Sequence, residues 1–245
     1  MPTCLVHLVV DAADPAGLAR FWAGALGWEV AVEEPDEVAV SPEGFVYPDP
    51  AAQPLVFVPV PEPKTGKNRV HLDLASDSAE HQAALVRRLR DLGATPADIG
   101  QGEVPWVVLA DPEGNELCVL EPRPRYRDTG PVAAVVIDCQ DPEALARFWG
   151  AAAGWTLTGS DGSMSSLRSP GGEGPYLELL RAGGAKAGKN RIHCDVAPHR
   201  DGDHLAEAAR LRQSGATPAD VGQGDVRWVV LADPEGNEFC VLSPR

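Results

Sequence analysis

Three polar residues alternate with apolar ones in the first half of the chain. Arg69, His71 and Asp73 stand two positions apart, so an extended strand would place them on one face. In a hydrogen-bonded row, such a guanidinium, imidazole and carboxylate could brace or line a ligand cavity. The imidazole could alternatively ligate a metal ion. The same row recurs in the second half as Arg191, His193 and Asp195.

A single histidine, His7, lies within an apolar segment at residues 5–9. An imidazole in a buried apolar strand needs a polar partner, because burying it unpaired costs free energy. The sequence leaves open whether that partner is a metal ion or ligand, or another side chain of the core. Trp106 and Trp228 each begin an apolar strand and are candidates for contact with a ligand.

The chain contains two copies of one unit. Residues 93–120 match residues 215–242 at 24 of 28 positions. The segment between the copies is rich in proline and charged residues, which is typical of a linker. We therefore expect a first module at residues 1–122, a linker at 123–131 and a second module at 132–245.

Each module contains the same order of predicted elements. In the first module, Asp14 and Gly27 have the positions of an N-terminal cap and a C-terminal stop around one helix. A second helix is expected at residues 79–92. Strands are expected at residues 4–10, 28–32, 38–40, 55–60, 70–74, 95–99, 106–110 and 116–120. The pattern βαβββ therefore occurs twice in each module, and the predicted fold class is α+β.

The composition argues against several kinds of partner. The chain has 245 residues, and 36 acidic residues against 21 Lys and Arg give it a net charge of −15. Such a charge disfavours nucleic-acid backbones and anionic lipid, so we expect neither nucleic acid nor a membrane as partner. Its apolar runs are far shorter than the roughly 18 residues of a membrane span. Five cysteines without a CxxC pair indicate reduced thiols, and we expect a cytoplasmic protein.

Several motifs occur twice in the same order. They are DPAGLARFWAGALGW at residues 14–28, KNRVH at 67–71 and WVVLADPEGNE at 106–116, with near-identical counterparts in the second module. In these motifs the chain resembles the vicinal oxygen chelate superfamily of glyoxalases, bleomycin-resistance proteins and extradiol dioxygenases. It looks most like tandem glyoxalase-like proteins of actinobacterial type. The resemblance implies two tandem modules, each a pair of βαβββ units forming a cup-shaped mixed sheet with helices on its outer face. They would pack as a pseudo-dimer within one monomeric chain.

The resemblance also implies a ligand set for a divalent metal. Metal-binding members use residues of the first, fifth and eighth strands, and the matching positions here are His7, His71 and Cys118. The family usually has a glutamate at the last position, and Glu116 lies two residues earlier on the same strand face. With Glu116 the set would suit Fe, Mn or Ni, whereas the Cys118 thiolate would favour Zn. In the second module Ala134 replaces the first histidine, so a metal is expected in the first module only.

Two functions follow from the resemblance. The first is a metal-dependent lyase or isomerase, or a dioxygenase, acting on a small oxygenated compound in the first module with Glu116 as catalytic base. The alternative is a metal-free protein that binds an antibiotic or another natural product. In both cases a small-molecule ligand would contact the walls of the cups. The expected contacts are Arg69, Asp73 and Trp106 in one wall and His193, Asp195 and Trp228 in the other.

Overall fold

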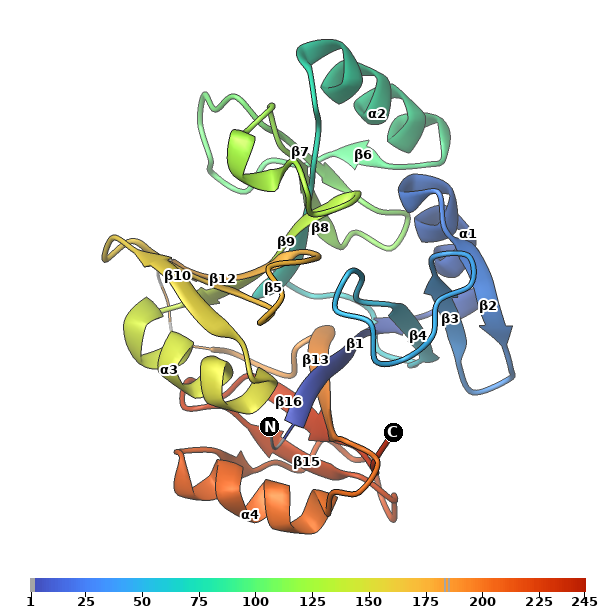
Figure 1. Cartoon of the computed structure of the whole chain (residues 1–245). Coiled ribbons are helices and arrows are strands. Elements are labelled where there is room, and N and C mark those ends of the chain that lie inside the picture. Colours follow the sequence, from blue (N-terminus) through green and yellow to red (C-terminus); the bar gives the residue numbers. More distant parts are fainter. Residues whose placement is uncertain (1–2, 183, 185) are drawn as a thin grey trace.

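The computed structural model describes residues 3–182, 184 and 186–245. Its strands form two eight-stranded mixed sheets, accompanied by four α-helices (Figure 1). Sheet A has the strand order β14-β15-β16-β13-β1-β4-β3-β2, and sheet B has the order β10-β11-β12-β9-β5-β8-β7-β6. Neither sheet closes into a barrel. The predicted α+β class, with βαβββ units in pairs, is confirmed.

The strands of sheet A are β1 (Thr3–Ala12), β2 (Glu29–Glu33), β3 (Val38–Ser41), β4 (Leu55–Pro59), β13 (Ile192–Pro198), β14 (Thr217–Pro218), β15 (Val229–Ala232) and β16 (Glu238–Val241). Those of sheet B are β5 (Val70–Leu74), β6 (Thr95–Pro96), β7 (Val107–Ala110), β8 (Glu116–Val119), β9 (Val132–Cys139), β10 (Thr156–Ser160), β11 (Met164–Arg168) and β12 (Tyr176–Arg181). The helices are α1 (Pro15–Leu26), α2 (Ala79–Asp91), α3 (Pro142–Ala153), α4 (His204–Gln213) and the short 3-10 helix η1 (Pro124–Tyr126).

Each sheet combines one unit from each module. The first unit, β1 to β4, joins the last unit, β13 to β16, because β1 lies antiparallel to β13. The second and third units join in the same way through β5 and β9. Sheet B is therefore one continuous stretch of chain, whereas sheet A is assembled from the two ends. The expectation that each module forms its own cup-shaped sheet is therefore wrong, because each sheet takes one unit from each module. The module boundaries 1–122 and 132–245 stay a prediction from the repeat.

The helices begin and end where the sequence indicates. The Asp14 carboxylate accepts a hydrogen bond from the Gly17 backbone at 2.9 Å, and Gly27 ends α1 with a φ of 69° that favours glycine. Phe21 and Trp22 lie on the buried face of α1, which contacts β3 and β4. Burial of one such aromatic ring contributes about 1.5 to 3 kcal/mol. None of the helices in the described ranges has the length and apolarity of a membrane span.

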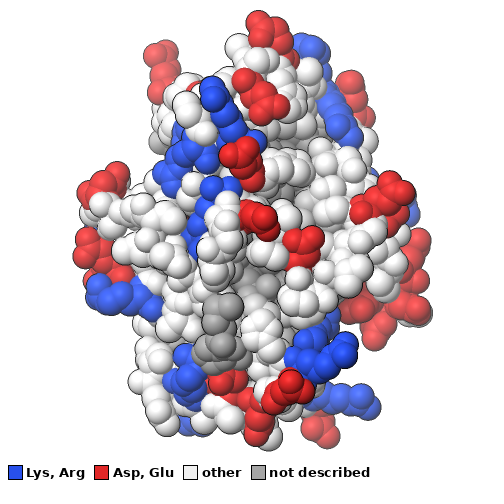
Figure 2. All heavy atoms as spheres, in the orientation of Figure 1, with Lys and Arg blue, Asp and Glu red and all other residues white. Residues whose placement is uncertain are grey.

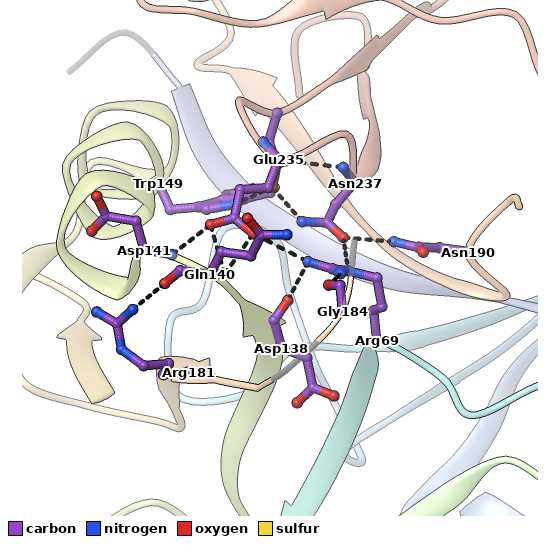
Figure 3. A network of polar contacts seen from close by, with 11 residues as sticks. Arg69, Asp138, Gln140, Asp141, Trp149, Arg181, Gly184, Asn190, Glu235 and Asn237 are labelled. Carbon is purple, nitrogen blue, oxygen red and sulfur yellow. Dashed lines mark hydrogen bonds and ion pairs between the residues drawn. The ribbon is translucent and has the colours of Figure 1, made fainter. Parts of the chain in front are cut away.

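An arginine immediately before β5 ties sheet B to sheet A. Arg69 donates hydrogen bonds to Asn237 Oδ1 at 3.0 Å, to Glu235 Oε2 at 3.2 Å and to the Asp138 carbonyl at 2.7 Å (Figure 3). Glu235 also accepts a backbone hydrogen bond from Asp141 at 2.8 Å. Asn237 and Glu235 belong to the turn between β15 and β16. This turn of the DPEGN motif therefore joins elements of both modules.

The other copy of the motif makes the reciprocal tie. Arg191 donates to Glu113 Oε2 at 3.0 Å and to the Asp11 carbonyl at 2.7 Å. Asp111, the first residue of that turn, accepts a hydrogen bond from Trp22 Nε1 at 3.2 Å. Hydrogen bonds to charged groups contribute about 1.5 to 3 kcal/mol each, so these ties hold the two sheets in fixed positions.

Candidate functional site

A cavity of about 470 Å³ lies against sheet B, and we call it cavity B. Trp106, Leu120 and Leu180 supply apolar parts of its wall, and His71 and Asp73 supply polar parts. Pockets of 300 to 1,000 Å³ with a few convergent polar groups are typical of small-molecule sites. The structure thus places two of the predicted ligand contacts, Asp73 and Trp106, and the predicted metal ligand His71 around one cavity.

Three buried polar side chains, His71, Asp73 and Cys118, form one group at the wall of cavity B, which we call cluster B. Their possible ligand atoms all lie within 4.8 Å of one another, and His71 Nε2 is 3.5 Å from Asp73 Oδ1. Within the described chain, His71 Nδ1 and Asp73 Oδ1 have no hydrogen-bond partner. Unpaired buried polar atoms cost free energy unless water, a ligand or an ion supplies the missing contact.

Burial shifts the protonation of cluster B. It lowers the pKa of His71 to about 4, with the nearby Lys67 charge acting in the same direction. Burial, reinforced by the charge of Glu178, raises the pKa of Asp73 to about 7. Burial and the Asp73 charge also raise the pKa of the Cys118 thiol. At neutral pH the imidazole is therefore neutral and the Asp73 carboxyl is about half protonated.

A second carboxylate, Glu178 of β12, lines cavity B. Its oxygens accept a hydrogen bond from Tyr126 Oη at 3.0 Å and pair with Arg125 at 3.0 Å. Burial raises the pKa of Glu178, against the lowering effect of the Arg125 charge. Tyr126 and Arg125 lie in the predicted linker, whose composition gave no sign of a role in the site. Nearby, the Arg123 guanidinium lies 5.6 Å from the ring centre of Trp106.

Sheet A carries the matching group, His193, Asp195 and Cys240, which we call cluster A. His193 Nε2 lies 3.4 Å from Asp195 Oδ1 and 3.6 Å from Cys240 Sγ. His7 of β1 contacts this cluster from outside, because its Nε2 is hydrogen-bonded to Asp195 Oδ2 at 3.0 Å. The polar partner that the sequence required for His7 is thus an aspartate of the second module.

The two aspartates have opposite electrostatic environments. Burial disfavours the charged form of Asp195, but the hydrogen bond from His7 and the His193 charge outweigh it, so the pKa of Asp195 is lowered. In sheet B the strand partner of Asp73 is Ala134, which cannot donate such a bond. The pKa of Asp73 is raised instead.

Replacing His7 with Ala is expected to lower the free energy of unfolding by about 2 kcal/mol at pH 7. The variant loses a hydrogen bond to a charged buried group and leaves Asp195 Oδ2 without its partner. Urea denaturation measures the change. The double variant His7→Ala/Asp195→Ala should cost less than the sum of the two single changes, and strict additivity would contradict the coupling.

The predicted metal set is not brought together in the chain. His7 lies in sheet A and His71 in sheet B, because their units are exchanged between the modules. Of the predicted ligands, His71 and Cys118 meet in cluster B, while His7 meets cluster A. The expectation of a metal in the first module only assumed that His7 and His71 bind the same ion. Because the two histidines lie in different sheets, the structure gives no basis for restricting a metal to the first module.

Glu116, the predicted catalytic base, has a bracing position. One carboxylate oxygen accepts a hydrogen bond from Lys64 at 2.7 Å and the other from the Asn68 backbone at 3.1 Å. Glu238 makes the same contacts with Lys186 and Asn190 in the second module. Glu116 therefore holds the loop before β5, and Glu238 holds the loop before β13.

Two other predicted ligand contacts lie away from cavity B. Arg69 is engaged in the tie between the sheets, because it precedes β5 and its side chain extends toward the turn of Glu235. It is therefore not hydrogen-bonded in a row with His71 and Asp73. Trp228 is 41% exposed, whereas its counterpart Trp106 is partly buried in the cavity wall.

The donor chemistry of both clusters fits a divalent metal. An imidazole, a carboxylate and a thiolate are three ligands of the kind that hold zinc in catalytic sites, where a fourth position takes water or substrate. The unpaired Oδ1 atoms of Asp73 and Asp195 lie 3.5 and 3.4 Å from the Nε2 atoms of His71 and His193, so each pair offers two ligand atoms to a metal. Cluster B borders cavity B directly, so it is the better candidate for chemistry on a bound molecule.

Comparisons with known proteins agree with the repeat and the fold. The family model described as Glyoxalase-like domain matches the chain twice, at residues 7–120 and 134–242. No curated protein matches the sequence.

Solved structures share the fold over the whole chain. Glyoxalase I from Zea mays is 16% identical, with a TM-score of 0.68, and the match covers 98% of this chain and 92% of that one. A candidate dioxygenase from Bacillus subtilis subsp. subtilis str. 168 is 15% identical, with a TM-score of 0.61, over 99% of this chain and 85% of that one. At this level of identity the likeness establishes the fold and leaves the chemistry to the site.

Proposed function

The chain belongs to the family of glyoxalase-like domains, and on that basis we propose that it acts on a small oxygenated compound in cavity B as a metal-dependent lyase or isomerase. The observation that carries the proposal is cluster B, where three donor groups converge at a cavity wall and two of their atoms lack partners. The thiolate favours zinc over redox-active iron. Proton transfer is therefore better supported than oxidation.

His71, Asp73 and Cys118 would hold the metal, which would polarise a substrate oxygen as a Lewis acid. A thiol and a carboxyl must lose their protons to become ligands. Because burial raises the pKa of both groups, metal binding is expected to release protons and to weaken as the pH falls.

Glu178 is the group best placed to carry a proton. It lines the same cavity as cluster B, and Tyr126 and Arg125 fix its orientation. Burial raises its pKa, which brings a carboxyl closer to the range in which it exchanges protons at neutral pH. The apolar side of Trp106 excludes water from that wall and offers a surface for the carbon skeleton of the substrate.

Cobalt(II) is a suitable probe, since thiolate ligands give it strong near-ultraviolet absorption. The protein is expected to bind two equivalents, one in each cluster. Cys118→Ser should remove about half of the thiolate absorption, and the matched variant Cys240→Ser should remove the other half. Loss of one of three protein ligands should weaken binding at that cluster at least tenfold.

Acetohydroxamate, a ligand with two adjacent oxygens, tests the link to cavity B. In Cys240→Ser protein it should shift the remaining cobalt bands, because the remaining ion borders the cavity. Trp106→Ala should weaken acetohydroxamate binding without releasing cobalt. If Cys118→Ser leaves the absorption unchanged, or no cobalt binds at all, the metal-dependent function is wrong and metal-free binding of a natural product takes its place.

A further inference from the structure

A second cavity, of about 740 Å³, lies between the two sheets, and we call it the inter-sheet cavity. Both copies of the KNR motif contribute to its wall. Its five basic lining residues are Lys64, Lys67, Arg69, Lys189 and Arg191, and its acidic ones are Asp11, Glu62 and Asp138. Only 21 of the 245 residues are Lys or Arg, so about a quarter of them line this one cavity.

The lining residues are more basic than the chain as a whole, although each of the five basic ones is paired with a carboxylate, three of them with Glu113, Glu116 and Glu235 outside the lining. Over the sequence, acidic residues outnumber basic ones 36 to 21, but along this wall five basic residues face three acidic ones. The acidic excess is carried elsewhere, for example by the exposed hairpin of β2 and β3, where Figure 2 shows acidic side chains gathered at the right-hand edge. That edge repels an anion, whereas binding at the inter-sheet cavity depends on the N–H donors that the ion pairs leave free.

Two lysines at the cavity have donors to spare. Lys67 and Lys189 pair with Asp138 and Asp11, respectively, yet their side chains are 37% and 36% exposed. An ammonium group has three N–H donors. Among the described residues, Lys189 is hydrogen-bonded to Asp11 alone, so its remaining donors can contact a bound group.

A buried donor without an acceptor lies in the same wall. Arg69 Nε donates to Asn237 Oδ1 at 3.0 Å, but its counterpart, Arg191 Nε, is buried and has no partner among the described residues. The Arg191 side chain is 10% exposed. An unsatisfied guanidinium N–H costs free energy that an acceptor from a ligand would recover. Lys189 and Arg191 stand two residues apart, and both contact Asp11.

We propose that the inter-sheet cavity binds a small oxyanion, a phosphate or carboxylate group, through Lys189 and Arg191. Lysine ammonium and arginine guanidinium groups are the usual partners of both anions. The site lies outside the function proposed for cavity B and shares only Lys67 and Asp138 with its lining. Its occupation does not depend on whether cluster B holds a metal.

Calorimetric titration of chelator-treated protein with inorganic phosphate, and separately with succinate, tests the site at constant ionic strength. One saturable equivalent is expected for at least one anion, and the preferred anion identifies the source of the oxyanion. The double variant Asp11→Asn/Lys189→Gln removes the ion pair without leaving a buried carboxylate unpaired. It should lower the affinity at least tenfold.

The matched control is Glu207→Gln/Arg210→Gln, which removes an ion pair on α4 with the same change of charges. It should retain the affinity of the unaltered protein. Trp106→Ala should also retain this affinity, because Trp106 lines cavity B and not the inter-sheet cavity. Anion binding can therefore be measured even if the function proposed for cavity B is wrong. Absence of saturable binding of both anions, or equal affinity in the two double variants, would overturn the proposal.

Discussion

Asp73→Asn protein should gain stability over the unaltered protein as the pH rises from 4 to 8, by as much as about 4 kcal/mol. The carboxyl has a pKa of about 7 in the folded protein, against 3.8 as its ordinary value. Each unit of difference corresponds to about 1.4 kcal/mol. The change concerns the metal-free protein, in which no ion compensates the buried charge.

The direction follows from which state binds the proton. Below pH 3.8 the carboxyl is protonated in both states and has no effect on the pH dependence. Between pH 3.8 and 7 the unfolded chain releases the proton while the folded chain keeps it, so the folded state loses stability throughout this window. An amide does not titrate, so the free energy of unfolding of the variant does not fall over this pH window.

Urea denaturation of chelator-treated protein at a series of pH values measures the effect. Asp195→Asn is the matched control. Burial alone would raise the pKa of Asp195, but the His7 hydrogen bond and the His193 charge outweigh this effect, and the pKa is lowered. That variant should instead lose stability relative to the unaltered protein once the pH exceeds 3.8. If the two variants show the same pH dependence, the opposite environments of the two aspartates are refuted.

The first half of the chain, residues 1–122, should assemble as a homodimer when it is produced alone. In the full chain β1 pairs with β13 and β5 with β9, so each half offers two unpaired central edges. The segments around β5 and β13, RVHLDLA and RIHCDVA, are close in sequence. In a two-fold dimer, β1 of one copy can pair with β5 of the other, which satisfies both edges.

Sedimentation equilibrium of the half chain should therefore give twice its monomer mass. Mixing it with residues 123–245 should produce the heterodimer that corresponds to the full chain. The homodimer would also bring His7 of one copy to the position that Ala134 occupies beside Asp73 in the full chain. A tighter cobalt site than cluster B of the full chain is expected there. A folded monomer with an intact eight-stranded sheet would contradict the exchange of units.

The local elements could be predicted from the sequence, because their signals are local. Asp14 and Gly27 fix the ends of α1, and alternating residues such as Val70 and Leu72 indicate a strand. Which units share a sheet could not be predicted in this way. Two similar partners for β1, namely β5 and β13, exist in the chain, and the hydrophobic pattern does not distinguish them.

The site was predictable only as far as single strands determine it. His71 and Asp73 both line the cavity because they alternate on one strand. Arg69 continues the same alternation but lies just before β5, where the chain turns and long-range partners decide its direction. Glu178 and Tyr126 meet through contacts 52 residues apart in sequence, for which a single sequence carries no signal.

The pairing of β1 with β13 has a consequence for synthesis on the ribosome. β13 begins at Ile192, so β1 lacks its native partner strand until most of the chain has been synthesised. At about 5 to 20 residues per second, the delay is roughly 10 to 40 s. During this time the nascent chain already displays β5, whose sequence resembles that of β13. β1 can therefore pair with β5 before β13 has been synthesised. Such a pairing would be a kinetic trap, and the chain must break or avoid it, alone or with a chaperone, to reach the native topology.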